Sequence, residues 1–349
     1  MTAEGVTQPG RSDPSVRPAD GDSRLSGTTV VEARGLTKTF GANRAVDGID
    51  LTVKEGEIFG VLGPNGAGKT TMLNMLATLL PIDSGEAKIF GYDVRREGHA
   101  VRQLIGVTGQ YASVDENLTA LENLWLFGRL QGLSSKRAHS IGDDLLVKFD
   151  LTEAAHRPIS QFSGGMRRRL DLAASLITRP ALIFLDEPTT GLDPRTRGQM
   201  WDTIRDLVVE GSTILLTTQY LDEADELADR ITVIDRGRKV AEGTPDELKA
   251  QIGTSSLRVS LVDDADTARA VALATELIRD TPILAPSGSG FSVKLSDANQ
   301  AADVLIALRD HHLEIANAAI EQPSLDEVFM ALTGRPSGTP VPETEVSDS

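Results

Sequence analysis

The segment VLGPNGAGKTTMLNML, at residues 61–76, constrains the fold of this chain more than any other stretch. Gly63, Gly68, Lys69 and Thr70 satisfy the pattern G-x-x-x-x-G-K-[ST], with an apolar strand before them and an apolar-periodic helix after them. Glycines let backbone amides turn inward around phosphate oxygens, and the helix N-terminus adds partial positive charge. The pattern therefore predicts a nucleotide phosphate site formed by Gly63, Pro64, Asn65, Gly66, Ala67, Gly68, Lys69, Thr70 and Thr71.

A second apolar run, ALIFLDEP at residues 181–188, ends in two carboxylates. In α/β sheets, ligands bind at the carboxyl ends of the strands, which is where Asp186 and Glu187 are expected to lie. Lys69 is expected to bridge the β- and γ-phosphates of ATP, while the Thr70 hydroxyl and Asp186 hold Mg²⁺. Glu187 can accept a proton from the attacking water. Together the two segments predict hydrolysis of Mg-ATP.

Strands and helices alternate from the phosphate-binding loop to about residue 240, which predicts an α/β fold. A largely parallel sheet is expected, with helices at 69–80, 194–209 and 220–228 covering it. Between about 110 and 178 the pattern is only helical, so a helical subdomain is expected there. The fold class is thus a P-loop NTPase with an ATP-binding domain at 29–245.

The order of the expected elements changes from about residue 254, where strand, helix, strand, strand, helix, strand and helix follow one another. This order predicts a small C-terminal α+β domain of ferredoxin-like type at 254–334. Residues 1–28 and 335–349 are rich in Gly, Pro, Ser and acidic residues and are expected to be disordered.

Charge and composition exclude several classes of protein. The net charge of −16 disfavours nucleic acid as the main partner. With no cysteine, the chain can have no disulfide framework and no thiolate catalysis. The N-terminus lacks an apolar h-region, and the sequence has no apolar run of about 20 residues. We therefore expect no signal peptide and a cytoplasmic protein that docks peripherally on the membrane.

The segment SQFSGGMRRRL, at residues 160–170, predicts a helix capped by Ser163, with Gly164 and Gly165 exposing its first amide groups. By itself this segment is an ordinary capped helix start. In a chain that already has a phosphate-binding loop, however, it is also a second helix N-terminus that could bind an anion. The basic run MRRRL is expected to be a solvated helix face, with a phosphate or partner contact as the alternative.

The order of phosphate loop, Gln110, SGGM, LIFLDEP, GLDP and the TTQ turn resembles the ATP-binding subunit of ABC transporters over about residues 29–245. The resemblance implies a head-to-tail homodimer with ATP sandwiched twice between the chains. Ser163, Gly164 and Gly165 of one chain would then meet the γ-phosphate held by the loop of the other.

The same resemblance assigns four further residues. Gln110 would reach the Mg²⁺ and the attacking water, and would sense a transmembrane partner. Asp193, in GLDP, would cross the dimer interface. Phe40 would stack on adenine with Val46 packing nearby; the alternative for Phe40 is core packing.

Three positions depart from the common family pattern. The signature reads Phe162-Ser-Gly-Gly-Met166, where the family form has Leu and Gln. Gln219 occupies the switch position, where most members have histidine. Glutamine can donate a hydrogen bond to the γ-phosphate but cannot take up a proton, so we expect Glu187 to be the general base and Gln219 a positioning residue.

SGGMRRRLDLAASLI, LLTTQYLDEADELADRI and SLDEVFMALTG together resemble the daunorubicin/doxorubicin-resistance type of this family. The resemblance implies export of a drug through a separate membrane permease. Export of lipid or polysaccharide, or a low-turnover regulatory ATP-binding module, is the alternative. The LDEVF helix would help assembly with the permease, or would pack its stripe of Leu325, Val328, Phe329 and Leu332 on its own domain.

Overall fold

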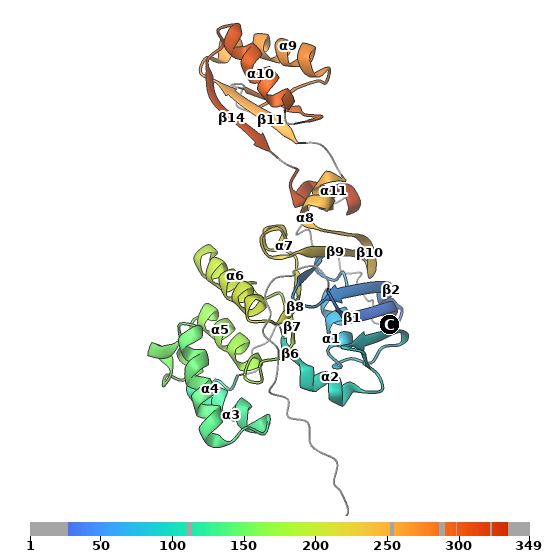
Figure 1. The fold of residues 1–349 in the computed structure, drawn as a ribbon, viewed down its shortest axis with the longest axis vertical. Helices are drawn as coiled ribbons and strands as arrows, with labels where there is room; N and C mark the ends of the chain where they lie inside the picture. The colour runs from blue at the N-terminus through green and yellow to red at the C-terminus, as the bar shows by residue number, and fades with distance from the viewer. Residues whose placement is uncertain are drawn as a thin grey trace, which may run out of the picture.

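The computed structural model describes residues 27–109, 114–251, 255–285, 290–297, 299–321 and 323–333. Its centre is a six-stranded sheet in the order β10-β9-β3-β8-β7-β6 (Figure 1). Only β10 runs antiparallel to its neighbour. The strands are β3 Ile58–Leu62, β6 Ile105–Thr108, β7 Leu182–Asp186, β8 Thr213–Thr218, β9 Arg230–Asp235 and β10 Arg238–Gly243. The predicted α/β class with a largely parallel sheet is confirmed.

The register of this sheet brings the predicted site segments to one edge. Every residue of β3, β7 and β8 is buried, as expected for parallel strands covered on both faces. Leu62 pairs with Thr218, and Asp186 pairs with Thr217. The phosphate loop, the two carboxylates and Gln219 therefore follow three adjacent strands at the same level.

A second, antiparallel sheet has the order β2-β1-β4-β5. Its strands are β1 Thr29–Phe40, β2 Asn43–Lys54, β4 Ser84–Ile89 and β5 Tyr92–Asp93. It shares one core with α1 (Lys69–Leu76) and with β3, and α2 (Gly98–Leu104) follows it in the chain. The sequence pattern indicates strands at 29–60 but not that they form a separate sheet.

The helices of the ATP-binding domain follow the predicted positions closely. Helix α6 spans Pro194–Val209 as predicted, and α7 spans Leu221–Leu227. The helix predicted at 69–80 is too long, because α1 ends at Leu76. Thr78 has a φ of 64°, a left-handed conformation that does not fit within a right-handed helix.

The described part of 110–178, where a helical subdomain is expected, is largely helical. It consists of α3 Ala120–Leu130, α4 Ser135–Lys148 and α5 Gly164–Ser175, with two short 3₁₀ turns, η1 Thr152–Ala154 and η2 Ile159–Gln161. An isolated antiparallel bridge joins Thr119 to Pro158. Figure 1 shows this subdomain on one side of the central sheet, away from β1 and β2.

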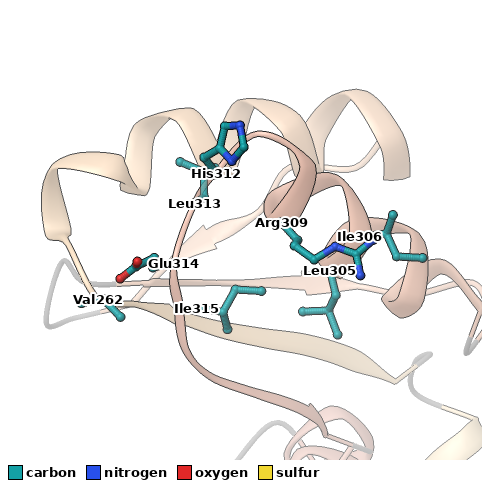
Figure 2. Close-up of a pocket in the computed structure, with 8 residues that line it drawn as sticks. All are labelled: Val262, Leu305, Ile306, Arg309, His312, Leu313, Glu314 and Ile315. Carbon is teal, nitrogen blue, oxygen red and sulfur yellow. The ribbon is translucent and has the colours of Figure 1, made fainter.

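The C-terminal region has the predicted order of elements. They are β11 Ser256–Leu261, η3 Asp264–Asp266, α9 Thr267–Ile278, β12 Ile283–Leu284, β13 Gly290–Lys294, α10 Asn299–Asp310, β14 Ile315–Glu321 and α11 Leu325–Thr333. The sheet order β12-β13-β11-β14 is antiparallel throughout. A hollow at the end of α10 is lined by Arg309, His312 and Glu314 among others (Figure 2). None of the predicted site residues lines it.

Helix α11 does not pack on the C-terminal sheet. Leu325, Val328 and Phe329 are at most 3% exposed and form one cluster with residues of α7 and of α8 (Pro245–Ala250), whereas Leu332 is 37% exposed. Own-domain packing is one of two interpretations of this stripe, and it is wrong for Leu325, Val328 and Phe329, which pack against α7 and α8 instead. In Figure 1, α11 lies beside α8, between the two domains. Within the described ranges, no helix is both long and apolar enough to span a membrane.

Candidate nucleotide-binding site

The loop after β3 is held in shape by backbone contacts. The Gly63 amide donates to the Thr218 carbonyl at 3.2 Å, and the Gly237 amide donates to the Ala67 carbonyl at 2.9 Å. Gly68 has a φ of 103°, and a Cβ there would lie 2.2 Å from the Ala45 carbonyl oxygen. Gly66, in contrast, has open space around its missing Cβ. The loop is therefore held in shape by backbone contacts, while the space at its tip, beside Gly66, is open.

Lys69 lies inside this loop with only 4% of its surface exposed. Its Nζ donates to the carbonyls of Gly63 and Pro64 at 2.8 and 3.1 Å, and lies 3.2 Å from Glu187 Oε1. Burial lowers the pKa of the Lys69 ammonium, and the Glu187 carboxylate opposes that shift. The structure thus joins the predicted phosphate-binding lysine to the predicted general base.

Asp186 and Thr70 meet at the predicted metal position. The Thr70 hydroxyl donates to Asp186 Oδ1 at 3.1 Å, and the Thr217 hydroxyl donates to the same oxygen at 2.5 Å. Hydroxyl and carboxylate oxygens are the ligands that Mg²⁺ prefers, so this pair fits the ion. The third predicted ligand, Gln110, lies outside the described residues. Within those residues, no three His, Cys, Asp or Glu side chains gather as a metal site by themselves.

Glu187 is held in an unusual backbone conformation. Its φ is 48°, in the left-handed region that non-glycine residues rarely adopt. Its amide donates to the Thr217 carbonyl at 3.1 Å, and its Oε2 accepts from the Thr190 hydroxyl at 3.2 Å. Thr190 and Thr217 were not singled out by the sequence patterns. Polar residues that end or follow an otherwise apolar buried strand are the signal that could have identified them.

One hollow of about 790 Å³ brings together segments far apart in the sequence. Its lining includes Asn65, Gly66, Gly164, Glu187 and the half-buried Gln219. Ser163 caps α5 as predicted, since its hydroxyl accepts from the Met166 amide at 3.3 Å. The phosphate loop, the base candidate, the switch glutamine and the start of α5 thus share one open space.

Three predicted residues lie elsewhere. Asp193 is the exposed N-cap of α6, where its carboxylate accepts from the Thr196 amide and hydroxyl. Phe40 is 49% exposed at the end of β1, which rules out the core-packing alternative. Val46 is fully buried in the core shared by the two sheets.

The basic run at 166–170 differs from the predicted solvated face. The side chains of Arg168 and Arg169 are only 14% and 17% exposed. Both donate to backbone carbonyls of other segments, whereas Arg167 pairs with Glu116 at the surface. The expectation of a solvated face is therefore wrong for Arg168 and Arg169.

The fold and the site together define a phosphate-loop ATPase. The ABC transporter family model matches residues 46–190, and the model described as ATP-binding protein DrrA1-3-like, C-terminal domain, matches residues 243–333. The chain therefore belongs to the ABC transporter ATP-binding proteins, in the branch of the daunorubicin/doxorubicin resistance proteins.

Two relatives cover nearly the whole chain. Daunorubicin/doxorubicin resistance ATP-binding protein DrrA of Streptomyces peucetius is 52% identical, over 89% of this chain and 94% of the relative. Daunorubicin resistance ATP-binding protein DrrA3 of Streptomyces coeruleorubidus is 50% identical, over 88% and 96%. Among solved structures, a dimeric ATP-binding cassette in a post-hydrolysis state with ADP and Pi superposes with a TM-score of 0.57 at 27% identity, over 61% of this chain and 98% of that one.

Proposed function

We propose that two copies of this chain clamp Mg-ATP head to tail and that its hydrolysis drives efflux of an amphipathic, anthracycline-like drug through a separate membrane permease. The observation that carries this proposal is the shared hollow of Asn65, Gly66, Gly164, Glu187 and Gln219. The names of the two relatives support a drug as the transported compound, and the dimeric structural neighbour supports the pairing of two cassettes.

The loop residues are proposed to bind the phosphates and the metal. The backbone amides of Gly66 and of Gly68 to Thr71 would face the phosphate oxygens, and Lys69 would neutralise the β- and γ-phosphates. Thr70, Asp186 and Gln110 would hold Mg²⁺, which neutralises charge that develops on the phosphates when it is bound. Phe40, which is exposed, offers a ring for adenine to stack on.

Glu187 is proposed to take the proton of the attacking water. Its carboxylate is paired with Lys69 in the structure, at 3.2 Å. A γ-phosphate that enters the loop competes for the Lys69 ammonium, and this competition frees the Glu187 carboxylate to face water. Gln219, in the same hollow, would donate a hydrogen bond from its side-chain amide to the γ-phosphate. It does not act as an acid or base.

Lys69→Ala tests the proposal with Mg-ATP binding and drug efflux as separate readouts. The variant should bind Mg-ATP about 10- to 100-fold more weakly, because a charge-assisted hydrogen bond contributes about 1.5–3 kcal/mol. Cells that express it with the permease should lose drug efflux. Lys88→Ala, at an exposed position of β4, is the matched control and should retain both Mg-ATP binding and drug efflux. Unchanged binding and efflux in the Lys69 variant would refute the proposal.

A further inference from the structure

Arg168 contacts four backbone carbonyls of two other segments. Its Nε donates to Pro188 O at 3.0 Å, and its Nη2 donates to Asp186 O at 2.6 Å and to Glu187 O at 2.9 Å. Its Nη1 donates to Gly109 O, at the end of β6, at 2.6 Å. One guanidinium thus joins three consecutive carbonyls, from the last residue of β7 onward, to Gly109 directly after β6 and to α5, on which Arg168 itself lies.

These contacts fall on a strained turn. Glu187 has a φ of 48°, and the left-handed conformation costs a non-glycine residue about 1–2 kcal/mol. Such conformations persist where the surroundings hold them. The Glu187 amide is fixed by the Thr217 carbonyl of β8, and the Glu187 carbonyl is fixed by Arg168. The residue is therefore held on both sides, and its side chain is directed toward Lys69.

The chemistry of the contact suits arginine in particular. A guanidinium presents five N–H donors in one rigid plane, whereas a lysine ammonium is a compact donor on a flexible stem. Asp171 Oδ2, one turn further along α5, lies 4.0 Å from Nη1 and balances the charge. Burial lowers the pKa of the Arg168 guanidinium, and the carboxylates of Asp171, Asp186, Glu223 and Glu187 oppose that shift.

We infer that Arg168 is a positioning residue for hydrolysis: it holds the turn that aims the Glu187 carboxylate, and it ties that turn to the helix that begins at Ser163. The inference rests on the proposed role of Glu187 as general base. Since α5 is proposed to meet the ATP held by the partner chain, Arg168 also connects the two ATP sites through one rigid contact.

Arg169 provides a matched control on the same helix. It donates to the Phe149 carbonyl at 3.0 Å, so Arg169→Gln also removes a backbone contact from a mostly buried arginine, but none to the turn after β7. Arg168→Gln should lower kcat about 10- to 100-fold while the Kd for Mg-ATP stays within about threefold, because small misplacements of a reacting group cost about 100-fold. Arg169→Gln should lower the Tm but keep kcat within about threefold. Arg168→Lys should recover part of the lost rate.

A double-mutant cycle with Glu187→Gln separates positioning from general damage. If Arg168 acts through Glu187, Arg168→Gln has no further effect on the residual rate in the Glu187→Gln background. Additive losses, or a normal kcat in folded Arg168→Gln protein, would overturn the inference. Should Arg168→Gln not fold, the same cycle with Arg168→Lys decides the question. Normal hydrolysis by Glu187→Gln alone would instead refute the proposed general base.

Discussion

The hydroxyl of Thr189, in the loop after β7, donates a hydrogen bond of 2.8 Å to Oε1 of Glu223, in α7. Both residues are fully buried, and the Trp201 indole N–H of α6 donates to the same oxygen at 3.3 Å. This carboxylate therefore joins the helix after the Gln219 turn to the loop after Glu187. Burial raises the pKa of Glu223, and the hydrogen bonds from Thr218, Thr189 and Trp201 oppose the shift.

The raised pKa predicts a pH-dependent effect of Glu223→Gln. The pKa of Glu223 is about 4.5 in the unfolded chain and higher in the folded protein. The folded state is therefore not penalised below pH 4.5, and stability is lost as pH rises through the pKa of the folded state. Glutamine keeps an acceptor for Thr189 and does not titrate. The unfolding free energy of the variant, relative to the wild type, should rise with pH above 4.5, by at most about 1.4 kcal/mol per unit. Urea denaturation between pH 4 and 8 measures it; a constant difference contradicts the prediction.

Glu187→Gln should retain nucleotide but hydrolyse it at least about 100-fold more slowly, since general-base catalysis contributes about 10²–10⁴-fold. The amide keeps the shape of the side chain and can still accept the hydrogen bond from Thr190. Equilibrium binding of Mg-ATP and steady-state phosphate release give the two readouts. A rate within about threefold of the wild type would exclude Glu187 as the base.

Gln219→His should remain active, because either side chain can donate a hydrogen bond to the γ-phosphate from this position. Gln219→Ala removes the donor and should lower kcat about 10- to 100-fold, the effect of one hydrogen bond to a charged group. The pH–rate profile distinguishes the roles: the wild type should show no ionisation from this residue, whereas the histidine variant gains one near neutral pH. Full activity of the alanine variant would show that Gln219 does not position the phosphate.

Phe329→Ala should destabilise the ATP-binding domain, because Phe329 is 3% exposed in the cluster with α7 and α8. Truncating a buried phenylalanine costs about 3–5 kcal/mol. Met330→Ala, next in the chain and 51% exposed, should change stability by no more than about 0.5 kcal/mol. Thermal unfolding of the three proteins measures both effects. Equal Tm values for the two variants would argue against this packing in solution.

Local sequence patterns predicted those parts of the structure that are determined by residues close together in the chain. The phosphate loop, the buried strand before Asp186 and the cap at Ser163 each depend on neighbours within a few residues. Contacts between distant segments could not be predicted in this way. The separate sheet of β1 and β4, the carbonyls held by Arg168 and the position of α11 all depend on where the whole chain brings its parts together.

The arrangement of α11 determines how this protein can be divided. The helix follows the C-terminal sheet in the chain, yet it shares a buried cluster with Leu221, Leu248 and Leu62, the residue directly before the phosphate loop. A fragment that stops after Ala250 would leave this apolar surface uncovered and prone to aggregate. An isolated catalytic half therefore needs residues 323–333 supplied back to it, for example by a short linker that replaces the intervening sheet.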